Sequence, residues 1–166
     1  MYVSWAPWRM EYIQSDPISG CLFCQKHSEN SDKQNYILFR SSLCFAILNL
    51  YPYNTGHLMV APVRHVADIT NLSKEEMIDI MELVQKGVGA LRHVYKPEGF
   101  NIGLNLGIVA GAGITDHLHI HIVPRWQGDT NFMPVLADTK IMPQHLQKTY
   151  EVLLPLFVEP ESKKLK

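Results

Sequence analysis

The stretch that decides the fold of this chain is His117-Leu118-His119-Ile120-His121-Ile122-Val123, which Pro124 follows. Strict alternation of histidine and aliphatic residues is typical of a β-strand, because successive side chains of a strand project to opposite faces. The three histidines therefore share one face, at intervals of about 6.6 Å, and the aliphatic residues face a core. Proline has no N–H for the ladder, so we expect the strand to end at Pro124.

Further strands are expected on the N-terminal side of this stretch. Alternating and apolar runs predict two strands within 36–49, around a turn at 40–42, and further strands at 57–62 and 100–106. Short turns join several of these segments, which favours antiparallel pairing.

Two segments have helical patterns. Ser73 and Glu76 form a capping-box pattern, and apolar residues at helical spacing (Met77, Ile80, Met81, Val84, Val88 and Leu91) then extend it to about Tyr95. A shorter helix is expected from about Pro143 to Leu154. Together these elements predict an α+β fold, an antiparallel sheet of about five strands with one long and one shorter helix.

The composition indicates one domain that spans 1–166, with an irregular segment at 1–35 and a frayed tail at 155–166. A net charge of −1 gives no basic face for nucleic acid, and no apolar run reaches the length of a membrane span. We found no apolar signal core at the N-terminus and expect a cytoplasmic protein. Three cysteines, an odd number, argue against a disulfide framework.

The row of histidines has three possible explanations. Histidines that merely pack in a core are common singly but not three in line. A metal ion held by the row alone is a poor fit, because the outer pair lies about 13 Å apart while zinc–nitrogen bonds measure about 2.0–2.1 Å. Nucleophilic catalysis is the third explanation, since a neutral imidazole attacks well near neutral pH.

The loop at 107–113 strengthens the catalytic explanation. It is rich in glycine and alanine, which let a backbone approach a ligand closely and form an anion-binding nest. A phosphate beside a row of histidines indicates phosphoryl or nucleotidyl chemistry.

The chain resembles the histidine triad (HIT) superfamily of nucleotide hydrolases and transferases. Beyond the histidine row, residues 45–49 and 55–62 are similar to the family's upstream strand pair. Similarity to the microbial branch of diadenosine-tetraphosphate phosphorylases and hydrolases extends over Trp5-Ala6-Pro7-Trp8-Arg9, residues 103–107 and 110–113, and Pro124-Arg125-Trp126. The resemblance implies the HIT fold, a homodimer formed through the long helix and a sheet edge, and cleavage of a nucleoside polyphosphate at the α-phosphate.

The resemblance also implies roles for single residues. His119 matches the nucleophile that becomes nucleotidylated, His121 a phosphate contact that assists the leaving group, and His117 the residue that orients the nucleophile. His57 matches a fourth, supporting histidine. The implied nucleotide-binding positions are Asn49 at the ribose, Asn105, Gly111, Gly113, Ile114 and Thr115 at the phosphate, and Trp126 at a base.

Cys21 and Cys24 have the spacing of half a zinc site or of a redox motif, and the pair could also be a chance occurrence. No strand pattern precedes them, which argues against a thioredoxin-like motif. In some HIT relatives such a pair is completed by a histidine about forty residues later and by the first histidine of the triad. The resemblance thus implies structural zinc held by Cys21, Cys24, His65 and His117.

Two other functions stay open from the sequence. One is a hydrolase of nucleoside phosphoramidates, and the other is a nucleotide-binding sensor with negligible turnover. The intact histidine row favours an enzyme over a sensor, because binding alone needs no placed nucleophile.

Overall fold

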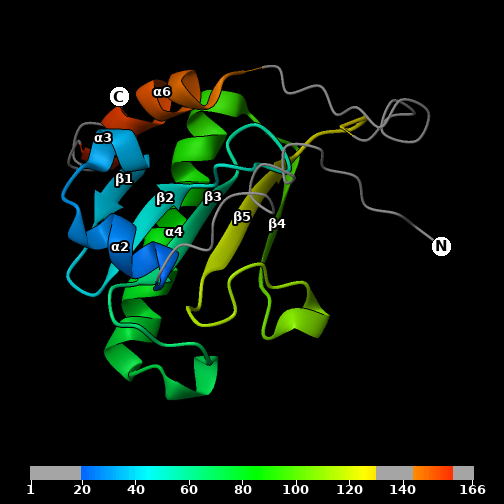
Figure 1. Ribbon diagram of the computed structural model, residues 1–166. Helices are drawn as coiled ribbons and strands as arrows, with labels where there is room; N and C mark the ends of the chain where they lie inside the picture. Colours follow the sequence, from blue (N-terminus) through cyan, green and yellow to red (C-terminus); the bar gives the residue numbers. More distant parts are fainter. Residues whose placement is uncertain (1–19, 130–143, 159–166) are drawn as a thin grey trace.

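The structure is a computed structural model that describes residues 20–129 and 144–158. Five antiparallel strands form a sheet in the order β1-β2-β3-β5-β4, with β1 and β4 at its edges (Figure 1). The strands are β1 (Ile37–Arg40), β2 (Cys44–Leu48), β3 (Leu58–Pro62), β4 (Gly99–Leu104) and β5 (Ile120–Arg125). The predicted α+β architecture and its five strands are confirmed.

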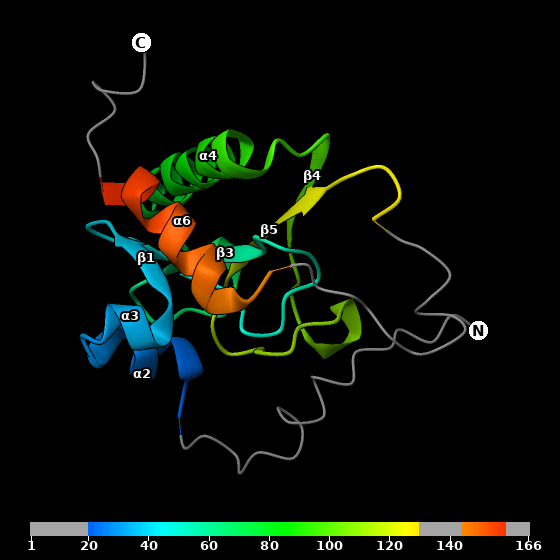
Figure 2. The same ribbon diagram turned by 90° about the horizontal axis from the view of Figure 1, so that it is seen from above.

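Two helices cover one face of the sheet. The long helix α4 (Lys74–Tyr95) lies against β2, β3 and β5, and α6 (Leu146–Val158) lies against β1 and α4. Figure 2 shows both helices on the same side of the strands. The capping box is present, because the Ser73 side chain accepts from the Glu76 N–H and the Glu76 carboxylate accepts from the Ser73 N–H. No helix in the described ranges combines the length and apolarity that crossing a bilayer requires.

Alternation along the strands divides the core into two clusters. On the helix side, buried side chains such as Leu58, Ile122 and Leu91 pack together. On the opposite side a smaller cluster contains Phe23, Ile37, Phe45, Ile47, Met59 and Ala61. The smaller cluster lies next to the histidines, so both faces of the central strands are buried.

The expected irregular segment at 1–35 was wrong for its second half. The short helices α2 (Leu22–Ser28) and α3 (Asp32–Asn35) lie on the face opposite α4 (Figure 2). Arg40 holds them, since its guanidinium donates to the Asp32 carboxylate and to the His27 carbonyl. Such short helices depend on tertiary contacts rather than on a periodic pattern. Residues 1–19 lie outside the described residues.

Two expected endpoints were also wrong. β5 does not end at Pro124 but continues by one residue to Arg125, and Pro124 itself pairs with Phe100 of β4. The Pro124 carbonyl faces away from β4 and accepts from the Asn54 amide, so the missing N–H removes no bond from the β4 ladder.

α6 continues past Pro155 to Val158, where Phe157 is fully buried. Burying a phenylalanine side chain contributes about 1.5–3 kcal/mol, which offsets much of the roughly 3 kcal/mol cost of a proline within a helix. The remainder of the expected tail, 159–166, lies outside the described residues.

Part of the apolar pattern of α4 faces solvent. Ile80, Val84 and Leu91 are buried, whereas Met77 and Met81 are 44% and 53% exposed. Within residues 20–129 and 144–158, the structure also has two 3-10 turns, η1 (Ile69–Asn71) and η2 (Ile108–Ala110).

Candidate functional site

The histidine row lies where the chain enters β5. Only His121 belongs to the strand, while His117 and His119 precede it on a segment whose Leu118 N–H donates to the Val66 carbonyl. The predicted alternation nevertheless holds, because Leu118, Ile120 and Ile122 pack in the helix-side core. The histidines therefore share the opposite face of the sheet.

The hydrogen bond of His119 defines which of its nitrogens is reactive. Nδ1 lies 2.9 Å from the His117 carbonyl oxygen, which can only accept, so Nδ1 carries the proton. Nε2 is then the unprotonated nitrogen with a lone pair. Burial lowers the pKa of His119, and its ring packs on Phe23 with centroids 4.9 Å apart. The geometry and burial together favour a neutral imidazole with a basic Nε2.

His57 and His121 form a chain of hydrogen bonds whose direction the backbone fixes. The Tyr53 N–H donates to His57 Nδ1 over 3.1 Å, so His57 carries its proton on Nε2. His57 Nε2–H then donates to His121 Nδ1 over 2.9 Å, which leaves the His121 proton on Nε2. The ring centroids of His119 and His121 are 4.8 Å apart. A basic nitrogen and an N–H donor thus come from neighbouring rings.

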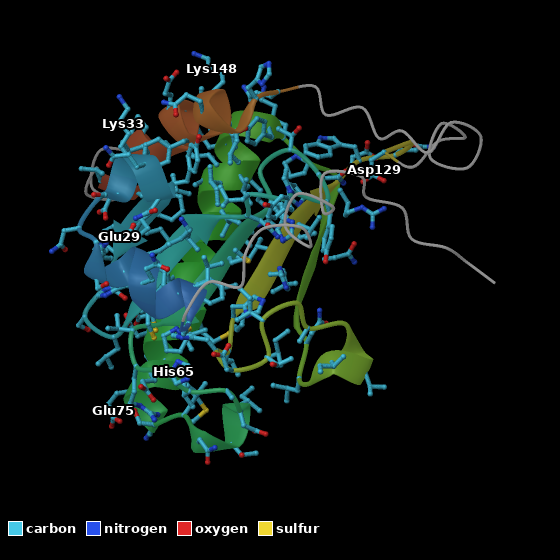
Figure 3. The ribbon with its side chains drawn as sticks, in the orientation of Figure 1. Glu29, Lys33, His65, Glu75, Asp129 and Lys148 are labelled. Carbon is cyan, nitrogen blue, oxygen red and sulfur yellow. The ribbon has the colours of Figure 1, made fainter. Side chains whose placement is uncertain are left out.

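His117 belongs to a different cluster. Its Nε2–H donates to the Pro62 carbonyl over 2.8 Å, so the unprotonated Nδ1 faces the two thiols. Nδ1 lies 3.2 Å from Cys21 Sγ and 3.6 Å from Cys24 Sγ. His65 lies on the connection between β3 and α4 (Figure 3). Its Nδ1 is 3.4 Å from Cys24 Sγ.

These four side chains could hold a metal ion. One donor atom from each lies within 4.8 Å of the others. Tetrahedral zinc with bonds of about 2.3 Å to sulfur and 2.0–2.1 Å to nitrogen separates neighbouring sulfur and nitrogen ligands by about 3.5 Å. The observed sulfur–nitrogen distances of 3.2–3.6 Å fit that geometry. The bond from His117 to Pro62 is the outer contact that orients a histidine ligand.

A cavity of about 230 Å³ opens beside His119 and His121. Asn49, Gly111, Gly113 and Ile114, all expected at a nucleotide, line it. The side-chain amide oxygen Oδ1 of Asn49 accepts from the Tyr51 N–H, which orients the amide. The remaining lining residues include Leu22, Phe23, Lys26, Ile47, Tyr53 and Met59.

The other expected nucleotide residues lie elsewhere. Asn105 lines a neighbouring hollow that also reaches His121, and its amide donates to the Gly111 carbonyl. Trp126 lines neither hollow, and its indole N–H donates to the Tyr95 carbonyl at the end of α4. Thr115 is exposed and also lines neither hollow.

The side of the cavity that α2 forms was not predicted from the sequence. Leu22 and Phe23 stand between the two cysteines of the Cys-x-x-Cys pair, and Lys26 follows one turn later. The signal for this wall was the pair of apolar residues Leu22 and Phe23 between Cys21 and Cys24. If both cysteines bind one metal ion, the residues between them are held beside it.

Comparison with known proteins identifies the class. The HIT domain model matches residues 30–128, and the chain belongs to the HIT family. An AP-4-A phosphorylase of Mycobacterium tuberculosis is 41% identical over 157 residues, covering 90% of this chain and 80% of the relative. A bis(5'-adenosyl)-triphosphatase of Dictyostelium discoideum is 30% identical over 138 residues, covering 79% of this chain and 91% of the relative.

Solved structures agree on the fold. A zinc-bound histidine triad family protein from Mycobacterium smegmatis superposes with a TM-score of 0.67 at 24% identity, covering 83% of this chain and 93% of that one. The family membership and the HIT fold expected from the sequence are therefore confirmed.

Proposed function

We propose that this protein is an enzyme that cleaves a dinucleoside polyphosphate at the α-phosphate through a nucleotidyl intermediate on His119. The observation that carries the proposal is the bond from His119 Nδ1–H to the His117 carbonyl, which leaves a basic Nε2 at a cavity large enough for part of a nucleotide. The names of the two curated relatives support a dinucleoside polyphosphate as substrate.

In the first step the nucleoside occupies the cavity and Nε2 of His119 attacks the α-phosphorus. A phosphorus–nitrogen bond forms, the bond to the bridging oxygen breaks, and its electron pair leaves with the polyphosphate. The polyphosphate is a weak base and departs as an anion, so no proton transfer is required. His121 Nε2–H stabilises the charge on the phosphate oxygens by hydrogen bonding.

In the second step water or inorganic phosphate attacks the same phosphorus. The phosphorus–nitrogen bond breaks and returns its electron pair to Nε2, which restores neutral His119. With water the product is a nucleoside monophosphate and the proton passes to solvent. With phosphate the product is a nucleoside diphosphate. Through both steps the His117 carbonyl stabilises the cationic ring by accepting from Nδ1–H.

The same proposal assigns zinc as the ion that Cys21, Cys24, His65 and His117 would bind. Two thiolates and two imidazoles would fill the four positions that structural zinc prefers, so a bound ion would add stability and would leave no position open for chemistry. As ligands of one ion, Cys24 and His117 would connect α2, which carries Phe23 and Lys26 of the cavity wall, to the residue whose carbonyl orients His119. His117 thus acts as a positioning residue.

Homodimerisation and a cytoplasmic location belong to the same proposal. Met77, Ile78 and Met81 on α4 and Ile102 on the edge strand β4 are exposed apolar side chains, which supports a dimer through these two elements. Thiols that serve as metal ligands are typical of a reducing compartment. Light scattering after gel filtration tests the dimer.

Product analysis with diadenosine tetraphosphate tests the reaction. ADP formed with ATP only when phosphate is present identifies a phosphorylase, and AMP with ATP in its absence identifies a hydrolase. AMP released from adenosine phosphoramidate, with the tetraphosphate left intact, would overturn the proposed substrate class. Tight nucleotide binding without any turnover would overturn the enzymatic proposal in favour of a sensor.

A further inference from the structure

The floor of the cavity is a row of side chains that runs across the sheet. His121, Met59 and Ile47 line the cavity and pair in that order from β5 to β3 to β2. The same register line continues beyond the cavity, where Ile47 pairs with Ile37 of β1. Neighbouring strands are about 4.8 Å apart, which puts Ile47 roughly 10 Å from His121. A nucleotide with its phosphate at His119 and His121 therefore extends its base towards Ile47 and β1.

Lys26 stands at that far end. Among the described residues that line the cavity it is the one lysine or arginine. Its ammonium lies 2.9 Å from the amide oxygen of Asn35, which is two residues before the start of β1. The neighbouring lining residues Leu22, Phe23 and Ile47 are apolar, so Lys26 is the cationic donor that a base at this end would meet.

The ammonium is held in place by a buried amide. Asn35 is 5% exposed, and its Nδ2 donates to the Glu29 carboxylate over 2.7 Å and to the Lys26 carbonyl over 3.4 Å. These bonds turn the amide oxygen of Asn35 towards Lys26. An ammonium has three N–H donors and Asn35 takes one, so further donors are available to a ligand in the cavity.

We propose that Lys26 determines base specificity by donating to the edge of a purine and favouring guanine over adenine. The inference rests on the proposed function, because it needs a nucleoside in this cavity. Guanine presents two adjacent acceptors, O6 and N7, whereas adenine presents an amino donor in place of O6. An ammonium cannot accept, so the adenine amino group would face it without a partner.

Binding of GMP and AMP measured by calorimetry on the full chain tests this inference. Wild-type protein binds GMP more tightly than AMP. Lys26→Met keeps the length and the apolar stem, and we expect it to weaken GMP about tenfold or more with little effect on AMP, the usual consequence of losing a bond from a charged donor. Lys26→Gln introduces an acceptor beside the base, which the adenine amino group can use, and shifts the preference towards AMP.

The matched control is Lys33→Met, since Lys33 is exposed on α3 and lines no part of the cavity. It leaves the ratio of GMP to AMP affinity unchanged. An unchanged ratio in Lys26→Met and Lys26→Gln, with only a lower melting temperature, would overturn the inference and leave Lys26 as a brace for Asn35. Binding with the stated preference but without turnover would overturn the proposed function alone. Failure to bind either nucleotide would overturn both.

Discussion

Replacing one cysteine of the metal cluster should separate the metal site from the rest of the fold. Cys24→Ser removes the sulfur that lies 3.4 Å from His65 Nδ1 and 3.6 Å from His117 Nδ1. Zinc present at a hundred times its dissociation constant stabilises a folded chain by about 2.7 kcal/mol. For a chain of this size, each kcal/mol of unfolding free energy changes the melting temperature by roughly 2–4 °C. We therefore expect Cys24→Ser to melt roughly 5–11 °C below the wild type.

The same substitution should slow turnover without abolishing it. His117 orients His119 through one carbonyl bond, and a net loss of about 1 kcal/mol there corresponds to roughly fivefold in kcat. The assay combines zinc content by mass spectrometry, melting with and without chelator, and kcat.

Cys44→Ala is the matched control, because Cys44 is a fully buried thiol outside the cluster. Chelator should lower the melting temperature of wild type and of Cys44→Ala by the same amount and leave that of Cys24→Ser unchanged. Stoichiometric zinc in Cys24→Ser, or a wild type that does not respond to chelator, would refute the reasoning.

Three further predictions concern other parts of the fold. His57→Phe removes the donor that orients His121 as a hydrogen-bond donor to the phosphate, and it should lower kcat about a hundredfold in steady-state assays, with binding of product nucleotide retained; a wild-type kcat would refute it. The Arg125 guanidinium, together with the Trp126 N–H and the Asn54 amide, holds the pKa of Asp129 well below its usual range. The Asp129 carboxylate therefore stabilises the fold above about pH 4, and this contribution is lost as the pH falls through the lowered pKa of the folded state. The stability advantage of wild type over Asp129→Asn in urea unfolding should therefore shrink progressively below about pH 5, and an advantage that grew on acidification would contradict this assignment. Phe157→Ala should destabilise the chain by about 3–5 kcal/mol in the same urea assay, because the ring is fully buried at the end of α6; a loss below 1 kcal/mol would instead favour a frayed helix end.

Much of the fold could be predicted because local sequence patterns determine where its strands and its long helix lie. Alternation marked the strands, and Ser73 with Glu76 marked the start of α4. The helices α2 and α3 were missed because they are held by Arg40 and by the burial of Phe23, contacts that no local pattern reveals. The continuation of β5 through Pro124 depended on which side its carbonyl faces, which only the register defines.

The candidate site was predictable in its residue types but not in its connections. The histidine row indicated a shared face, yet the separate surroundings of its members come from distant backbone groups at Pro62 and Tyr53. The cluster of Cys21 and Cys24 with His117 spans more than ninety residues, so only the family resemblance could connect them beforehand. The role of Trp126 at a base stays a prediction; its indole N–H donates to the Tyr95 carbonyl at the end of α4, a contact that the residue type alone did not reveal.

The most direct test of the central claim is to trap the nucleotidyl intermediate. Protein mixed with diadenosine tetraphosphate is quenched within milliseconds in alkaline denaturant, where phosphorus–nitrogen bonds survive, and its intact mass and peptides are measured. We predict one adenylyl group per chain on His119, absent from His119→Ala. A label on His121, or turnover by His119→Ala at the wild-type rate, would contradict the proposed mechanism.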